Sequence, residues 1–135
     1  MKPALSAIVA AVAALSACAS LSVGRRLNRS PDMRAADGTV KFRTLRGADT
    51  GIDLRVKHLV EPDQLLPPGY VYVAWVRRTP DDPAQNVGVL NLDADLAGAL
   101  TTVTPLRRFT LFVTVEATRD AERPAGPRLL WASRE

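Results

Sequence analysis

The sequence predicts an all-β protein: an immunoglobulin-like antiparallel β-sandwich of about seven strands, preceded by a signal peptide and a flexible linker. Most of the ten prolines and eight glycines lie between apolar runs, which indicates short elements joined by turns. Beyond Gly38 the apolar residues recur with a period of two, as in strands. After Cys18 no stretch long enough for a helix shows helical periodicity.

The composition is that of a folded domain. The chain has 135 residues, of which 47% are hydrophobic and 24% are charged, and its mean hydropathy is −0.01. These values exclude a disordered or membrane-embedded chain and leave room for one domain plus a short appendage.

The predicted strands follow one another with turn signals between them. Residues 52–57 alternate apolar and polar side chains, whereas residues 70–76 are apolar on both faces, as in a central strand. The predicted strands are residues 39–45, 52–57, 70–76, 86–92, 98–104, 109–116 and 128–132. The side chains expected in the core are Leu54, Val71, Val73, Trp75, Leu111, Val113 and Val115.

The N-terminus has the pattern of an export signal. Lys2 precedes an uncharged run from Ala4 to Ala17. Crossing the hydrocarbon core takes about 20 apolar residues, so this run is too short to span a membrane and reads as the apolar part of a signal peptide.

The run ends in Leu15, Ser16, Ala17 and Cys18, which resembles the bacterial lipobox. The resemblance implies acylation of the Cys18 thiol and cleavage before it, with residues 1–17 as lipoprotein signal peptide. More than one acyl chain gives durable anchoring, since each buried CH₂ contributes about 0.8 kcal/mol. The alternative is an ordinary secretory signal with Cys18 incidental, but an exposed thiol in an oxidising compartment would be a liability.

The expected location is therefore the cell envelope, with the protein anchored by lipid. Ala19 follows the cysteine where an aspartate would often signal inner-membrane retention. The outer membrane, facing the periplasm, is favoured in a Gram-negative organism.

Residues 18–37 are predicted to be the lipidated N-terminus and a flexible basic linker, with the sandwich covering residues 38–135. Cations crowd this region and the first strand, against only Asp32 and Asp37. They are Arg25, Arg26, Arg29, Arg34, Lys41, Arg43 and Arg46. Such a cluster is compatible with nucleic acid or with an anionic lipid surface, and the export signal favours lipid. No nucleic-acid partner is expected.

Three short motifs resemble the extracytoplasmic C-terminal domain of anti-sigma-K factors. They are Tyr72 with Trp75, the strand end Val113–Glu116, and the turn Pro124–Pro127. The resemblance implies a sandwich outside the cytoplasm. It does not carry over sigma-factor binding, because no sigma-binding domain or spanning helix precedes the sandwich here, and "DAER" replaces the usual paired glycines of the penultimate turn.

The residue inventory offers little for catalysis, and no catalytic, cofactor or metal residues are predicted. His58 is the only histidine and Cys18 the only cysteine, so a His-and-Cys zinc site within one chain is excluded. His58 is expected to be a partly exposed residue at the end of a strand. Asp93 with Asp95, and Asp81–Asp82, are expected to bind their own turn backbone rather than calcium.

Two further features have a structural and a functional interpretation. Glu116 ends the strongest predicted strand, and we expect it to pair with Arg108 or Arg128 or to cap a turn amide. The aromatic side chains of Tyr70, Tyr72 and Trp75 are expected to lie in the core rather than to form a ligand platform.

Three function classes follow from these observations. The first is a non-catalytic lipoprotein that binds another envelope protein or a surface polymer, or serves a structural role. The second is a detached sensor module of an anti-sigma-factor-like signalling system. The third, a hydrolase or metal-dependent enzyme, is disfavoured by the residue inventory.

Overall fold

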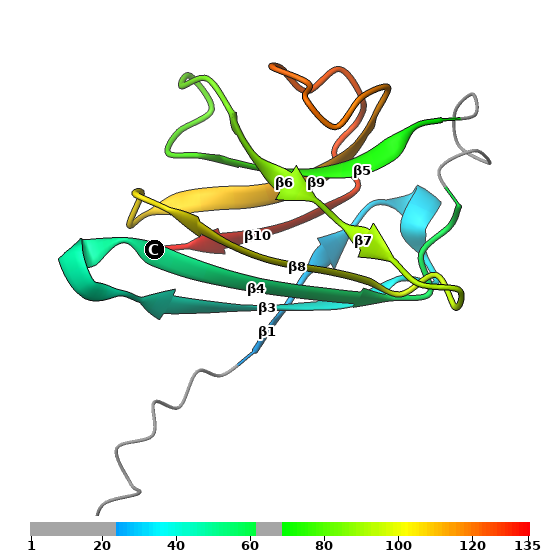
Figure 1. The fold of residues 1–135 in the computed structure, drawn as a ribbon, viewed down its shortest axis with the longest axis horizontal. Coiled ribbons are helices and arrows are strands. Elements are labelled where there is room, and N and C mark those ends of the chain that lie inside the picture. Colours follow the sequence, from blue (N-terminus) through cyan, green and yellow to red (C-terminus); the bar gives the residue numbers. More distant parts are fainter. Residues whose placement is uncertain (1–23, 62–68) are drawn as a thin grey trace, which may run out of the picture.

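A computed structural model describes residues 24–61 and 69–135, which form two antiparallel five-stranded sheets packed face to face (Figure 1). The first sheet consists, in spatial order, of β1 (Arg25–Arg26), β3 (Asp37–Thr44), β4 (Thr50–Lys57), β8 (Gly98–Thr104) and β7 (Asn91–Leu92). The second consists of β2 (Asn28–Arg29), β10 (Leu130–Arg134), β9 (Phe109–Glu116), β5 (Val71–Arg77) and β6 (Gln85–Val89).

The predicted all-β sandwich is confirmed, with ten strands in the described residues rather than seven. Each of the seven predicted segments contains strand. The segment predicted at residues 86–92 divides into β6 and β7, and the last strand runs two residues further than predicted. One sheet orders its main strands β3-β4-β8-β7 and the other β10-β9-β5-β6, which is the order of an immunoglobulin-type sandwich.

Two of the places where the chain passes from one sheet to the other are marked by a leucine. Leu90 lies between β6 and β7, is buried, and donates its N–H to the Tyr72 carbonyl at 3.0 Å. Leu27 lies between β1 and β2 and donates its N–H to the Gly38 carbonyl at 2.9 Å. A Cβ on Gly38 would lie 2.5 Å from Leu27 Cδ1, so a larger residue there would displace the Leu27 side chain.

The prediction of a flexible linker through residue 37 is wrong for residues 24–37, which belong to the sandwich. β1 pairs with β3 and β2 pairs with β10, and the 3₁₀ helix η2 (Pro31–Met33) follows. Met33 and Ala36 are 1% and 2% exposed, within the core between the sheets. These residues form structure because edge strands offer free backbone groups to any extended chain, whatever its side chains.

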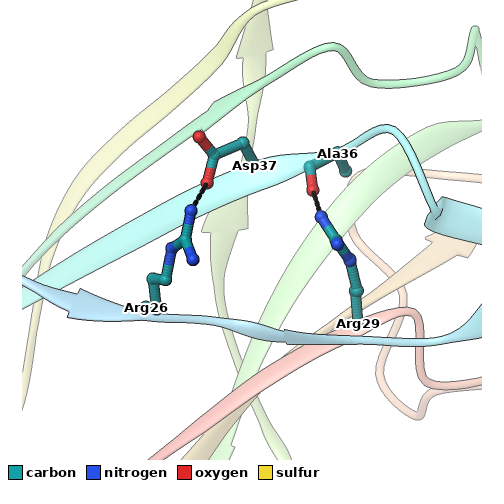
Figure 2. Close-up of polar contacts among 4 residues, drawn as sticks. All are labelled: Arg26, Arg29, Ala36 and Asp37. Atoms are coloured by element: carbon teal, nitrogen blue, oxygen red, sulfur yellow. Dashed lines mark hydrogen bonds and ion pairs between the residues drawn. The ribbon is translucent and has the colours of Figure 1, made fainter.

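Side chains reinforce this attachment, as Figure 2 shows. Arg26 lies 3.7 Å from the Asp37 carboxylate, and Arg29 donates to the Ala36 carbonyl at 2.7 Å. Arg25 donates to the Ser133 carbonyl on β10. These arginines therefore hold the first strands to the domain instead of lying on a solvated linker.

The core between the sheets is built from alternate residues of each strand. Leu54, Leu111, Val113 and Val115 lie there as predicted, together with Tyr72, which the prediction also placed in the core. A T-shaped contact between Phe42 of β3 and Phe109 of β9, with ring centroids 5.3 Å apart, joins the two sheets.

β5 is apolar on both faces because a second cluster covers its outer face. Val73, Trp75 and Phe112 are at most 3% exposed, on the side of the second sheet away from the first. Val71, predicted in the core, is only partly buried beside them. Ala121, from the loop of residues 117–129, packs on this cluster, so the loop serves as its cover.

The described residues contain one further 3₁₀ helix, η3 (Arg46–Ala48), at the β3–β4 turn. In this part of the chain no helix has the length and apolar character needed to cross a membrane.

Candidate functional site

The lipobox residues Leu15, Ser16, Ala17 and Cys18 lie outside the described residues, so the candidate site is sought in the sandwich. One end of the sandwich gathers the β3–β4 turn, the β5–β6 turn, the β8–β9 turn and the end of β10, at the left of Figure 1. We name it the arginine-rich end. Its arginines are Arg43, Arg46, Arg77, Arg78, Arg107, Arg108 and Arg134, and its acids are Asp49, Asp81, Asp82 and Glu135.

Arg134 joins the two sheets at this end. Its guanidinium donates to the Thr50 hydroxyl and, at 2.8 Å, to the Thr44 hydroxyl. Thr50 is fully buried and donates its own hydroxyl to the Leu106 carbonyl at 2.7 Å. This chain of hydrogen bonds fixes the turn that carries Arg107 and Arg108 relative to Arg134.

The fixed turn and β10 border a surface cavity of about 350 Å³. Its lining residues are Thr44, Ala48, Arg107, Arg108, Arg134 and Glu135. A neighbouring cavity of about 310 Å³ shares Arg108 and Arg134 and adds Arg78. Guanidinium groups from separate turns thus converge on one surface, an arrangement suited to phosphate or carboxylate oxygens.

The charges at this end are incompletely neutralised. Arg78 lies 3.4 Å from Asp82. Among the described residues, Arg107, Arg108 and Arg134 form no ion pair with a carboxylate, although Glu135 lines the same cavity. The end therefore keeps an excess of positive charge available to a ligand.

The opposite end has the reverse balance. It carries η2, the start of the β4–β5 connection, the β7–β8 turn and the two ends of the loop of residues 117–129, whose middle folds back over the outer face of the second sheet. Its turns contain Asp32, Glu61, Asp93 and Asp95 against Arg34 and Arg128. The sandwich is therefore electrically asymmetric along its long direction.

Of the four predicted turn carboxylates, Asp93 binds its own turn backbone and Asp82 binds side chains. Asp93 accepts from the N–H of Asp95 at 2.8 Å and of Ala97 at 3.0 Å, which closes the β7–β8 turn. Asp82 accepts from the Thr79 hydroxyl at 3.1 Å. No group of three or more His, Cys, Asp or Glu suited to a metal occurs in residues 24–61 and 69–135.

His58 lies where the sequence places it, exposed at the end of β4, with a positive φ of 59°. Tyr72 lies in the core, and its hydroxyl donates to the Val60 carbonyl. Burial raises the pKa of Tyr72 to about 12. The indole N–H of Trp75 donates to Thr114 at 2.9 Å on the opposite face of β5, so these two aromatic rings do not form a shared platform.

Glu116 caps turn amides, one of the two alternatives predicted for it. Its carboxylate is 3% exposed and accepts from the N–H of Ala125 at 3.1 Å and of Gly126 at 3.2 Å, and from the Thr114 hydroxyl. The predicted pairing with Arg108 or Arg128 is not formed: Arg128 lies over the Trp131 ring at 4.2 Å, and Arg108 belongs to the arginine-rich end.

Sequence reasoning missed the arginine-rich end. The local signals are Arg43 and Arg46 of the basic cluster near the N-terminus, and the dipeptides Arg77-Arg78 and Arg107-Arg108, each next to the end of a predicted strand. Their convergence depends on β5 and β9 being antiparallel neighbours, which brings Arg77 opposite Thr110.

Comparison with known proteins assigns no family, since no family model matches the chain and no curated protein matches it.

Proposed function

We propose that the protein is a lipid-anchored component of a bacterial cell envelope whose β-sandwich binds another envelope protein or polymer without catalysing a reaction. The anchor is the acylated Cys18, and the lipobox of Leu15, Ser16 and Ala17 directs its modification. The non-catalytic role is supported by the residue inventory, which holds one histidine and one cysteine.

The observation that carries the binding role is that two loops, the β7–β8 turn and the loop of residues 117–129, are held by turn or buried carboxylates. Glu116 binds the backbone of residues 125–126, and Asp93 binds that of residues 95–97. Asn86 adds hydrogen bonds to the Arg119 carbonyl at 2.9 Å and the Ala121 carbonyl at 3.0 Å. Loops ordered before binding lose little conformational entropy on contact with a partner.

The loop of residues 117–129 is the proposed contact. Arg119, Glu122 and Arg123 on it are exposed, whereas its anchoring atoms are partly buried. Exposed charged side chains on an anchored loop give a partner specificity through complementary charges.

Affinity capture tests this function. Full-length protein solubilised from the envelope in mild detergent should retain a specific partner, and the variant carrying Arg119→Ala and Glu122→Ala should lose it. Thr101→Ala, on the exposed outer face of β8, is the matched control and should retain it. Failure to capture any specific partner, or equal capture by the loop variant, would contradict the proposal.

A second candidate is the detached sensor module that the family resemblance implies. It is supported by the way the residues of that resemblance cluster: Trp75 donates to Thr114, Thr114 to Glu116, and Glu116 accepts from Ala125 and Gly126. This candidate expects a gene for a sigma factor or its regulator beside the gene for this protein, and fails if neither is there.

A further inference from the structure

We propose that the arginine-rich end docks on the phosphate headgroups of an anionic lipid bilayer, with Arg107, Arg108 and Arg134 as the contacting residues. The proposal rests on the lipid anchor at Cys18. Unlike a freely tethered domain, the docked domain would meet the membrane with one defined end of the sandwich.

The first argument is the place where the chain enters the fold. Arg25 pairs with Val40 and Arg26 with Thr39, so β1 runs antiparallel to β3. An ideal Cβ on Gly24 would lie 3.8 Å from Lys41 side-chain atoms, which places Gly24 beside Lys41. Going back toward the N-terminus, the chain therefore approaches Thr44, at the arginine-rich end.

The second argument is the length of chain available. Residues 19–23 are all that separates Cys18 from Gly24, and such a segment spans at most about 20 Å. Gly24 lies three strand positions, or about 10 Å, short of Thr44. The acylated sulfur therefore reaches no more than about 10 Å beyond the level of Thr44.

This distance is comparable to the range of the electrostatic force. The Debye length at physiological ionic strength is about 8 Å, so charges at the arginine-rich end experience the surface potential of the anchoring membrane. A freely extended linker of about 20 residues would have held the domain beyond that range much of the time.

The third argument is charge and geometry. The Arg134 guanidinium is fixed by Thr44 and Thr50, and the backbone of the Arg107–Arg108 turn is fixed by the Thr50 bond to Leu106, so the three arginines border one cavity. Planar guanidinium groups bind phosphate oxygens in a bidentate fashion. Each basic residue near an anionic leaflet favours contact by about 1 kcal/mol, or about fivefold in equilibrium constant.

The test uses full-length lipidated protein reconstituted into vesicles of phosphatidylcholine alone or of equal parts phosphatidylcholine and phosphatidylglycerol. Because Cys18 is the only cysteine, Pro105→Cys places a single fluorophore at the arginine-rich end, and Ala94→Cys places one at the opposite end. A lipid with a spin-labelled headgroup quenches whichever fluorophore lies at the membrane surface.

The expected result is stronger quenching at position 105 in the anionic vesicles than in the neutral ones, with little quenching at position 94. The double variant Arg107→Gln with Arg108→Gln should lower the ratio of docked to undocked protein by about 25-fold. The matched control at the opposite end, Arg34→Gln with Lys57→Gln, also removes two exposed positive charges and should leave it unchanged. Circular dichroism checks that each variant keeps its strands.

Equal quenching in the two kinds of vesicle would overturn the docking proposal. Quenching at position 105 that is as strong in the Arg107 and Arg108 variant as in the wild type would also overturn it. So would binding of inorganic phosphate at this cavity together with equal quenching in the two kinds of vesicle, because the cavity would then serve a soluble phosphate. Flotation with neutral vesicles reports on the anchor separately. Protein that floats without anionic docking retains the proposed anchor, and protein that binds only anionic vesicles retains the docking surface alone.

Discussion

Glu116 illustrates how a single buried charge is accommodated without a counter-ion. Among the described residues its partners are backbone N–H groups and a threonine hydroxyl, all of which donate to a carboxylate. Such charge-assisted hydrogen bonds are stronger than neutral ones and offset part of the cost of burial. Gly126 is required at this point, because a Cβ on it would lie 2.5 Å from the Val115 carbonyl oxygen.

The raised pKa of Tyr72 predicts that the fold loses stability at alkaline pH. This pKa rises from 10.0 to about 12 because burial disfavours the phenolate. An unfolded chain loses this proton near pH 10 while the folded chain keeps it. The contribution of Tyr72 to stability is therefore complete below pH 10 and is lost as the pH rises toward 12.

The variant Tyr72→Phe should remove this dependence on pH. At neutral pH it should lower the free energy of unfolding by about 1 kcal/mol, because the Val60 carbonyl loses its hydrogen-bond donor. Urea unfolding of both proteins at a series of pH values measures the two effects. Tyr70→Phe, at a partly buried neighbour, is the control that should retain the alkaline decline. An equally steep decline in Tyr72→Phe would refute the assignment.

Among the elements, the short strands at the N-terminus depart most from expectation. β1 and β2 have two residues each, and their exposed side chains show no alternation that predicts a strand. They form because the edges of β3 and β10 present unpaired backbone groups, a cause that leaves no mark in the local side-chain pattern.

Met33 tests whether residues 24–37 belong to the fold. It is 1% exposed in the core, so Met33→Ala should lower the free energy of unfolding by about 2–5 kcal/mol through lost contacts and a cavity. Chemical denaturation measures the change. Asp32→Ala, exposed in the same 3₁₀ helix, is the control and should change it little. If Met33→Ala lost no stability, residues 24–37 would not belong to the folded domain and would act as a linker.

The longer strands were predictable, because each of them carries its own evidence. β4 alternates with a period of two, and β5 and β9 are rich in β-branched and aromatic residues. What remained hidden is which face of β5 meets which neighbour. Tyr72, Ala74 and Val76 face the other sheet, while Val73 and Trp75 face the loop of residues 117–129.

In the molecule as a whole, charge is distributed along the sandwich from an arginine-rich end to an end whose turns are richer in acids. The proposed anchor would place the arginine-rich end nearer the membrane, because the chain before β1 leads back toward that end. The β7–β8 turn, at the other end, would then face away from the membrane.

Cys18→Ser tests the anchor itself. The wild-type protein should fractionate with membranes and incorporate a labelled fatty acid, and the variant should do neither, because serine offers no thiol for acylation. Ser20→Ala, two residues further along and outside the lipobox, should behave as the wild type. Labelling that persists in Cys18→Ser would show that the lipid is attached elsewhere or that the interpretation of the lipobox is wrong.

Local patterns in the sequence were enough to predict the all-β sandwich, the seven main strand segments and most of the core, because alternation and turn residues act over a few neighbouring positions. The structure was needed to include residues 24–37 in the domain, to divide residues 86–92 between two sheets, and to find the partners of Glu116. It was also needed to bring Arg107, Arg108 and Arg134 to one cavity. These features depend on contacts between segments far apart in the chain, which a period of two does not encode.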